Sequence, residues 1–346
     1  MKTDVIIIGA GLSGLTLSYR LKKRGISSLL LEGRDLPGGR IRTLLSEGEP
    51  PVEMGATWFG EQHQHLKALI DDLNLSYFPQ YMKGKAFYQS SSMVPAQAID
   101  LPPQQSSYRI SGGSISFIDR LLKEAGPVYY NKRVDRIEVN SEGVTSHAGE
   151  EGYDAERVAV CLPPQLAVNK IQVDGVVNRE LEAVMRSTHT WMQESVKVAV
   201  TFKRPFWREK GWSGTLFSNT GPVTELYDHS DVNGEHFALC GFMQPAFRNL
   251  PVSEREKIVI AQLRSVFGDE VSKYMNYYDT AWARESMTAT EPLPDLFPHQ
   301  HNGHVLYDQW WVKDRIILGG SETSPVFGGY MEGAVYAAGR LAQQLS

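Results

Sequence analysis

The fold is decided near the start of the chain, by the stretch Asp4-Val-Ile-Ile-Ile-Gly9-Ala-Gly11-Leu-Ser-Gly14. Its unbroken apolar run is typical of a parallel strand that is buried on both faces. A helix is expected to follow from Leu15 to Arg24, because Gly25 supplies a stop signal, and a second strand is expected from Ser28 to Leu31. Strand, helix and strand in this order predict a βαβ unit.

The glycines of this stretch suit the binding of a nucleotide. Gly9 allows a tight turn, Gly11 lets the backbone approach a pyrophosphate, and Gly14 lets the helix and the strand pack closely. Glu32 closes the second strand at the position where a carboxylate accepts hydrogen bonds from ribose hydroxyls. An ordinary glycine-rich turn is the alternative for the glycines alone. Because a strand, a helix and Glu32 accompany them, the sequence predicts a dinucleotide site.

A second group of glycines follows Glu32, in Gly33-Arg34-Asp35-Leu36-Pro37-Gly38-Gly39-Arg40. Two adjacent glycines let the backbone pass close to a diphosphate. Arg40 offers a planar fork of donors that matches phosphate oxygens. A solvated surface arginine is the alternative for Arg40. The nicotinamide-dependent dehydrogenases do not carry this pattern, which therefore favours FAD over NAD.

These segments resemble the flavin monoamine oxidases, part of a large FAD family that also contains phytoene desaturases and protoporphyrinogen oxidases. The most specific resemblance lies near the C-terminus, in Arg315-Ile-Ile-Leu-Gly-Gly320-Ser321-Glu322-Thr323 and Gly328-Gly329-Tyr330-Met331-Glu332-Gly333-Ala334. It implies an α/β fold, with a Rossmann-like FAD-binding domain of the glutathione-reductase type and a discontinuous α+β substrate domain. Residues 1–75, 108–185 and 285–346 are expected to form the first domain, and residues 76–107 and 186–284 the second.

The resemblance also implies which residues bind FAD. Arg40 would face the diphosphate, Glu322 the ribityl and phosphate region, and the helix that begins at Met331 the pyrimidine edge of the flavin. Val134, inside a strand expected from Val128 to Val139, would hold the adenine through its backbone. The stretch Glu53-Met-Gly55-Ala56-Thr57-Trp58-Phe59-Gly60 would run past the flavin ring. The full expected set is Gly9, Gly11, Ser13, Gly14, Glu32, Arg34, Gly39, Arg40, Gly55, Ala56, Thr57, Trp58, Val134, Trp282, Glu322 and Met331.

One lysine is a candidate catalytic residue. Lys197 lies among the alternating apolar residues of Ser195-Val-Lys-Val-Ala-Val-Thr-Phe202, and burial of an ammonium there would be costly without a function. Lys197 lies eight residues before Pro205 in Pro-Phe-Trp, which is similar to the family lysine that holds a water at the flavin N5. A lysine on an edge strand that faces solvent is the alternative.

The monoamine oxidases place two aromatic rings beside the flavin to guide the amine. Tyr330 matches one of them, with a core tyrosine as the alternative. The second ring has no counterpart, because Glu291 or Pro292 falls at its position. The stretch Thr288 to Glu291 also lacks the cysteine that links the flavin in the animal mitochondrial enzymes, so FAD is expected to bind noncovalently.

Composition narrows the range of partners. The formal net charge is -5 and the chain has no basic run, which argues against nucleic acid. Cys161 and Cys240 are the only cysteines, too few for a disulfide framework or a zinc site, so no metal is expected. No apolar run approaches the length of a membrane span, and the start leaves no room for a signal peptide. A cytoplasmic protein without membrane contact is expected.

The expected reaction is FAD-dependent oxidation of a small amine. A hydride would pass from the carbon beside a neutral amine to flavin N5, and dioxygen would reoxidise the flavin with release of hydrogen peroxide. The alternatives are a desaturase or oxidase that acts on an apolar substrate, and an FAD-bound protein without catalysis. The resemblance is poor between Gly60 and Tyr108, where the family carries a longer helical subdomain. The substrate cleft is therefore expected to be more open.

Overall fold

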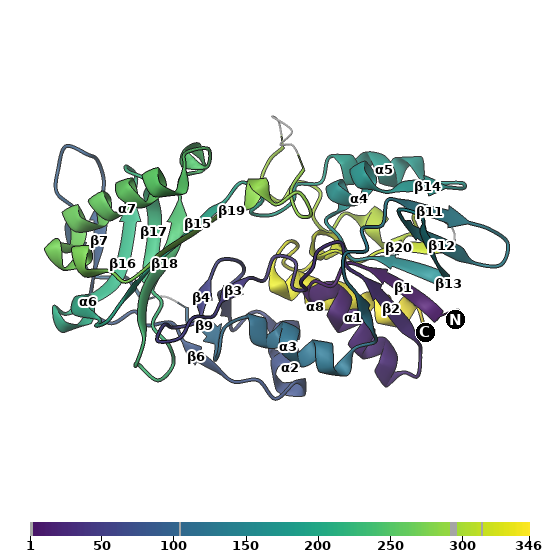
Figure 1. The fold of residues 1–346 in the computed structure, drawn as a ribbon, viewed down its shortest axis with the longest axis horizontal. Helices are drawn as coiled ribbons and strands as arrows, with labels where there is room; N and C mark the ends of the chain where they lie inside the picture. The colour runs from purple at the N-terminus through teal and green to yellow at the C-terminus, as the bar shows by residue number, and fades with distance from the viewer. Residues whose placement is uncertain (1–2, 104, 291–295, 313) are drawn as a thin grey trace.

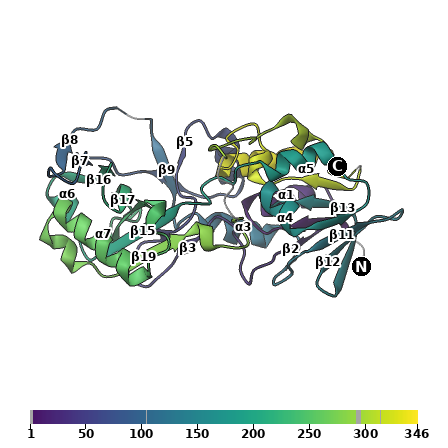
Figure 2. The same ribbon diagram turned by 90° about the horizontal axis from the view of Figure 1, so that it is seen from above.

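Two separate β-sheets form the two ends of the molecule (Figure 1). The computed structural model describes residues 3–103, 105–290, 296–312 and 314–346. Figure 2 shows the same division from above, with β7 and β16 at one end and β2 and β13 at the other. The predicted α/β class is confirmed. The Rossmann-like description and the domain boundaries given above stay predictions.

The first sheet has eight strands in the order β10-β2-β1-β13-β12-β11-β14, with β20 paired to β13. β1 runs parallel to both β2 and β13, and the pair β1 and β2 is joined through helix α1 (Leu12–Lys23). The strands span Thr3–Ile8 (β1), Ser28–Leu31 (β2), Val128–Tyr129 (β10), Arg136–Val139 (β11), Val144–Ala148 (β12), Glu151–Val160 (β13), Gln172–Asp174 (β14) and Ile316–Leu318 (β20).

Helices cover both faces of this sheet, which explains why β1 is apolar throughout (Figure 1). Val5 and Ile7 join a core formed with α1, α2 (Gln64–Asp72), α3 (Ile115–Glu124) and α8 (Met331–Gln344). Ile6 and Ile8 point to the opposite core, which is formed with α4 (Pro164–Lys170) and α5 (Arg179–Arg186). Successive residues of a strand face opposite sides, so each of the four has an apolar partner.

The second sheet has seven strands in the order β19-β15-β18-β17-β16-β7-β8. Helix α7 (Val252–Phe267) packs on one face, where Val259 and Leu263 contact alternate residues of the central strands. A short helix, α6 (Phe206–Glu209), follows β15. The strands span Lys85–Gln89 (β7), Gln97–Ile99 (β8), Val196–Phe202 (β15), Trp212–Ser218 (β16), Val223–Asp228 (β17), Phe237–Met243 (β18) and Tyr277–Ala281 (β19).

Two small sheets lie between the large ones (Figure 1). One pairs β3 (Thr43–Leu44) with β4 (Val52–Glu53), and the other has the order β5 (Phe59–Gly60), β9 (Ser107–Ile110) and β6 (Tyr77–Pro79). Short 3-10 helices complete the fold at Pro245–Phe247 (η1), Asp269–Lys273 (η2), Trp282–Arg284 (η3), Val305–Asp308 (η4) and Ser321–Thr323 (η5). β4 also contacts β18 of the seven-stranded sheet.

Several expected elements differ from those observed. The first helix begins at Leu12, three residues earlier than expected. The strand expected from Val128 to Val139 was wrong: β10 and β11 are separate strands, and Val134 lies in the loop between them. Asn131 explains the break, since its φ of 56° is left-handed and cannot continue a strand. The strand expected from Arg157 to Leu162 is the end of β13.

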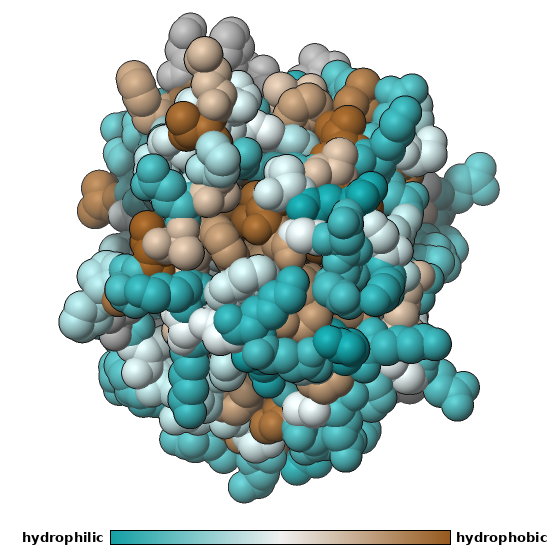
Figure 3. Space-filling model, turned by 90° about the vertical axis from the view of Figure 1, so that its left-hand side faces the viewer, coloured by the Kyte–Doolittle hydropathy of each residue, from teal (hydrophilic) through white to brown (hydrophobic). Residues whose placement is uncertain are grey.

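The surface carries hydrophilic residues over most of the end formed by the seven-stranded sheet, with apolar residues scattered among them (Figure 3). Single exposed apolar residues of this kind are ordinary for a globular protein. Within the described residues, the helices are all too short or too polar to cross a membrane.

Candidate active site

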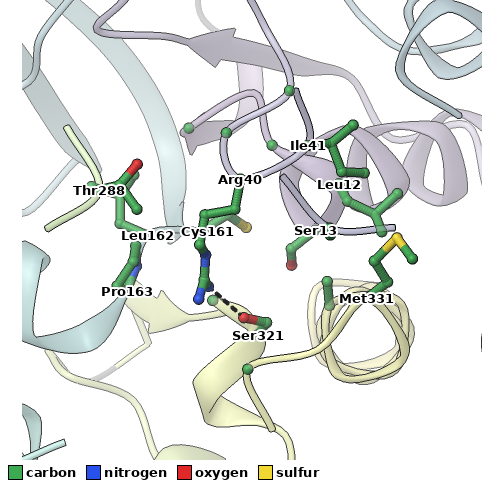
Figure 4. Close-up of a pocket in the computed structure, with 18 of the residues that line it drawn as sticks. Leu12, Ser13, Arg40, Ile41, Cys161, Leu162, Pro163, Thr288, Ser321 and Met331 are labelled. Carbon is green, nitrogen blue, oxygen red and sulfur yellow. Dashed lines mark hydrogen bonds between the residues drawn. The ribbon is translucent and has the colours of Figure 1, made fainter. Parts of the chain in front are cut away.

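A long cleft opens beside the carboxyl end of β1, where ligands bind in open α/β sheets (Figure 4). Its walls come from segments that are far apart in the sequence. Residues that line it include Gly9, Gly11, Leu12, Ser13, Glu32, Arg34, Gly39, Arg40, Ala56, Cys161, Thr288, Ser321, Tyr330 and Met331. The fold therefore brings together nine of the predicted FAD-binding residues and Tyr330.

The glycine loop has the geometry that its spacing predicted. Gly9 has a φ of 100°, a conformation that side chains rarely adopt. A Cβ on Gly14 would lie 2.0 Å from the carbonyl oxygen of Gly9, so α1 could not pack at this distance with any other residue. A Cβ on Gly11 would meet its nearest atom, in Gly39, only at 3.8 Å. Gly14 thus allows α1 to pack against the glycine loop, whereas the absence of a side chain at Gly11 leaves room in the cleft for a ligand.

Two helices begin at the cleft. α1 begins after Gly11 with no side-chain cap and no acidic residue in its first turn. α8 begins after Tyr330, also without a side-chain cap. Glu332 lies in the first turn of α8, but its carboxylate accepts the backbone N–H groups of His65 and Leu66 at 3.0 and 2.7 Å. Both helix termini therefore leave N–H groups and positive dipole ends for an anion.

Glu32 and Arg34 shape the middle of the cleft. The Glu32 carboxylate accepts hydrogen bonds from the backbone N–H groups of Ala10 at 2.8 Å and Arg34 at 3.0 Å. These bonds hold the end of β2 against the glycine loop. The guanidinium of Arg34 donates to the Gly39 carbonyl at 3.0 Å and to the Thr288 hydroxyl. Hydrogen bonds thus join Glu32 to the first glycine loop and Arg34 to the second.

Arg40 forms the strongest ion pair of the cleft. Its two terminal nitrogens bind both carboxylate oxygens of Glu322, at 2.6 and 2.9 Å, and one of them also donates to the Ser321 hydroxyl at 2.7 Å. Burial alone would raise the pKa of Glu322. The charge of Arg40 and the hydrogen bonds from Arg40 and Ser321 outweigh that effect and hold the pKa below its ordinary value. Glu322 is therefore a carboxylate at neutral pH.

Cys161 is the cysteine of the cleft. It is buried at the end of β13, and burial raises the pKa of its thiol to about 12. Hydrogen bonding with Ser13 opposes the shift only in part. A thiolate is the reactive form of cysteine, so this thiol is a poor nucleophile at neutral pH.

Lys197 lies on β15, beyond the cleft wall, and is almost completely buried. Its ammonium donates to the Gly55 carbonyl at 3.0 Å and to the Thr57 hydroxyl at 2.7 Å. The rings of Trp58 and Phe242 also contact it, with centres 4.3 and 4.7 Å from Nζ. The alternative of a solvent-facing lysine on an edge strand is wrong, because β15 lies between β18 and β19.

Burial has a clear effect on the charge of Lys197. Removal from water lowers the pKa of its ammonium, and the nearby Cys240 and Glu53 oppose that shift only in part. Glu53 is itself fully buried, and its burial raises the pKa of the carboxyl. Lys197 is thus an unusually acidic ammonium held in a fixed position. Perturbed groups of this kind are typical of functional sites.

Tyr330 stands at the other side of the cleft, 37% exposed, in a cluster of aromatic rings. Its ring is stacked on His299 at 5.5 Å, and His299 is stacked on Trp191 at 3.8 Å. The centres of Trp191 and Tyr330 are 5.3 Å apart, and Phe327 meets Tyr330 edge-on at 6.3 Å. Burial lowers the pKa of His299, so this ring is neutral at neutral pH. The cluster forms an apolar, uncharged wall.

Sequence reasoning missed Trp191 and His299. No local pattern marks either residue, and Trp191 meets His299 and Tyr330 only because the chain folds back over more than a hundred residues. Glu291 and Pro292, which were expected at the position of the second ring, lie outside the described residues.

The remaining predicted residues lie around the cleft without lining it. Val134 lines a smaller cavity that shares Gly9, Glu32 and Leu162 with the cleft. Gly55, Thr57 and Trp58 surround Lys197, as described above. The indole of Trp282 donates to the Met54 carbonyl at 2.7 Å and so braces the same segment. Trp282 and Lys197 thus both hold the segment from Met54 to Trp58.

Known proteins with this sequence pattern are oxidoreductases that act on amines. The family model for flavin-containing amine oxidoreductases matches residues 12–92 and 86–346. A probable flavin-containing monoamine oxidase A from Dictyostelium discoideum is 23% identical, and the alignment covers 99% of this chain and 97% of that protein. That alignment runs over 450 positions, against 346 residues here, so more than 100 positions have no residue in this chain.

Solved structures show the same fold. A putrescine oxidase bound to putrescine superposes with a TM-score of 0.86 at 21% identity, covering 99% of each chain. A cyclohexylamine oxidase from Brevibacterium oxydans also reaches a TM-score of 0.86, at 20% identity, and covers 100% of this chain and 99% of that one. At these identities the superpositions establish the fold and leave the substrate open.

Proposed function

Because the chain belongs to the flavin-containing amine oxidoreductase family, we propose that it binds FAD noncovalently and oxidises a small amine with dioxygen as the electron acceptor. One observation carries this proposal: Lys197 is a buried ammonium fixed beside the segment that forms one wall of the cleft. No other arrangement among the described residues combines a perturbed cation with a cleft suited to a dinucleotide.

The groups of the cleft fit FAD in particular. The uncapped start of α1 and the low wall at Gly11 suit a diphosphate, and Arg40 lines the cleft beside them with its charge paired to Glu322. Glu32 supplies a carboxylate for a ribose, and Val134 lines the adjoining cavity where an adenine would extend. The uncapped start of α8 at Met331 suits the electron-rich pyrimidine edge of a flavin. This order of groups along the cleft supports FAD over a mononucleotide.

Lys197 would hold a water toward the reacting atoms. A lysine ammonium carries three N–H donors, and two of them bind Gly55 and Thr57. The third is left for a water or a substrate atom. When FAD is bound it supplies the hydride acceptor and the means to pass electrons to dioxygen, so few acid or base residues are needed. The chain contributes a fixed cation, an oriented substrate and exclusion of water.

Tyr330, with Trp191 and His299, would form the wall that orients the amine. The neutral state of His299 matters, because a positive ring would repel a protonated amine and would strongly hydrate the wall. Flat aromatic faces instead exclude water and allow a neutral amine to approach. Trp191 and His299 would add aromatic surface beside Tyr330.

Noncovalent attachment is supported by Cys161. It is a cleft cysteine with a thiol that is protonated at neutral pH, so it does not offer a thiolate to the flavin. Denaturation in acid should release all of the yellow chromophore into the supernatant. A flavin that stays with the precipitated protein would contradict this part of the proposal.

Anaerobic reduction of the flavin tests the function directly. The FAD-loaded protein is mixed without oxygen with single amines that include putrescine, cyclohexylamine, aromatic monoamines and amino acids, and the visible absorbance of the flavin is followed. At least one amine is expected to bleach it, with peroxide formed when air is admitted. Failure of every amine with fully loaded protein would refute the amine oxidase activity.

The variant Lys197→Met tests the role of the lysine. Methionine keeps the length of the side chain, so flavin loading should survive while the rate of reduction falls by about 10²-fold or more, the usual size of a proton-transfer contribution. The matched control is Lys203→Met, which alters an exposed lysine just beyond β15. Equal reduction rates in both variants would remove Lys197 from the proposed mechanism.

A further inference from the structure

A second cavity, of about 220 Å³, shares no lining residue with the cleft. It lies where β9 meets the loop that follows β17, next to the residues around β4. Its entrance carries the exposed residues Val232 and Asn233. The cavity has no place in the amine oxidation described above, and its volume exceeds what a single water needs by several-fold.

A buried arginine faces this cavity without a full set of partners. Arg109, on β9, is 5% exposed and makes one hydrogen bond, from Nη2 to the Ser230 carbonyl at 2.5 Å. Its Nε is buried and has no hydrogen-bond partner among the described residues, and the nearby charge of Asp228 is paired with Arg208 instead. The ring of Phe78 covers one face of the guanidinium at 4.7 Å. Burial lowers the pKa of Arg109 to about 10, which reflects the cost of holding this cation out of water.

Asp228 and Glu53 are the carboxylates whose charges act on Arg109, and both already accept hydrogen bonds from other donors. Asp228 accepts two hydrogen bonds from Arg208, at 2.6 and 2.8 Å, and one from the indole of Trp207 at 2.7 Å. Glu53 accepts the backbone N–H group of Ser114. Neither carboxylate forms an ion pair with the arginine, so neither offsets its burial in full.

The other two carboxylates of the cavity lining are also held. Asp231 accepts from His236 at 2.8 Å and from the backbone of Glu235 at 2.9 Å. Glu49 accepts from three side chains that do not line the cavity, namely Thr201, Asn276 and Tyr278. Each lining carboxylate thus has donors of its own, while the lining guanidinium has a donor without an acceptor.

We propose that this cavity binds a small carboxylate, which pairs with the guanidinium of Arg109. A planar guanidinium matches a carboxylate in shape, and a pair formed out of water is strong because both groups are charged. Phe78, Ile110 and Val232 also line the cavity, which suits a short apolar chain behind the carboxylate. A simple carboxylic acid and a zwitterionic amino acid share this chemistry, and the carboxylate of Asp231, which also lines the cavity, suits the ammonium of the second.

Calorimetric titration of the FAD-loaded protein tests the proposal. Sodium acetate, propionate and glycine are titrated separately, in a carboxylate-free buffer at constant ionic strength. Saturable binding of one equivalent is expected, and tighter binding of glycine than of acetate would identify the zwitterion as the ligand class. Arg109→Gln should weaken the binding by about 30-fold or more, the usual loss when one member of a buried charged pair is truncated.

Two further variants keep the test decisive. Arg204→Gln makes the same substitution at an exposed arginine and should leave binding unchanged. Val232→Trp fills the entrance from an exposed position and should block binding even if Arg109→Gln fails to fold. Absence of binding by all three probes, binding that survives in both Arg109→Gln and Val232→Trp, or equally strong displacement by chloride would each overturn the proposal.

Discussion

The ion pair between Arg40 and Glu322 offers a direct test of how the cleft is held together. Glu322→Gln keeps the size of the side chain and one oxygen acceptor but removes the charge. In the native protein Arg40 is 24% exposed at its side chain and Glu322 is fully buried. The variant would therefore leave a largely buried guanidinium facing a neutral amide, and one amide N–H group would point toward another donor.

The magnitude follows from this burial. Removal of one partner of a buried ion pair costs about 3 to 5 kcal/mol of stability. Because Arg40 keeps some contact with solvent and glutamine retains one acceptor, we expect the lower end, about 3 kcal/mol. For a chain of 346 residues that loss corresponds to a fall in melting temperature of roughly 4 °C. The flavin should also be bound more weakly, since Arg40 lines the cleft.

Urea unfolding and flavin occupancy measure the two effects. The matched control is Glu285→Gln, because Glu285 pairs with Arg42 at 3.2 Å with both side chains about a third or more exposed. Such exposed pairs contribute at most about 1 kcal/mol. The pKa of Glu322 is lowered, so its contribution is present above pH 4.5 and is lost as the pH falls through the folded-state pKa. Equal losses in the two variants, or no change with acid, would refute this account.

Three further outcomes are expected. Burial lowers the pKa of Lys197, so the free energy of unfolding should rise as the pH increases toward 10.5, and urea titrations of Lys197→Met should lack that rise. Gly14→Ala should abolish soluble folded protein, because Gly14 has no room for a methyl group. Gly11→Ala has room for the methyl group and should keep its circular dichroism spectrum, but the methyl group would project into the cleft and lower the affinity for flavin. Tyr330→Leu should retain flavin but lower kcat/KM for amines by about tenfold, measured by peroxide release, through loss of one aromatic face.

The nucleotide-binding part of the fold could be predicted because its signals are local. The residues Val5 to Ile8 of β1 pack alternately into two cores, one on each face of the sheet. A strand buried on both faces is apolar at every position, so the continuous apolar run predicted this burial. The glycine positions were informative for the same reason. Gly14 relieves a contact with the Gly9 carbonyl five residues away, and Gly9 relieves contacts with Cys161 and Leu162 at the end of the adjacent strand.

Prediction failed where a single residue overrode an apolar pattern. The run from Val128 to Val139 has strand-forming residues at both ends, yet Asn131 takes a left-handed conformation and divides it. An asparagine tolerates that conformation better than most residues, but it does not require it. The turn is therefore fixed by its surroundings, including a hydrogen bond from the Asn131 N–H group to the Arg34 carbonyl.

The aromatic wall could not be predicted from the sequence at all. Trp191 follows a buried threonine, and His299 lies in a loop with a left-handed φ of 61°. Neither position carries a period or a motif, and the contacts that bring them to Tyr330 join three separate segments. Their role becomes visible only when the rings are seen in one place.

The segment from residue 40 to residue 58 explains how distant groups form one site. At one end Arg40 binds Glu322, which follows β20 of the eight-stranded sheet. At the other end the Gly55 carbonyl accepts the ammonium of Lys197, on β15 of the seven-stranded sheet. A Cβ on Gly55 would lie 2.2 Å from the Arg40 carbonyl, so the two anchor points touch each other. The position of Lys197 relative to the cleft is therefore coupled to Arg40 through the Gly55 carbonyl and the close approach of the two backbones.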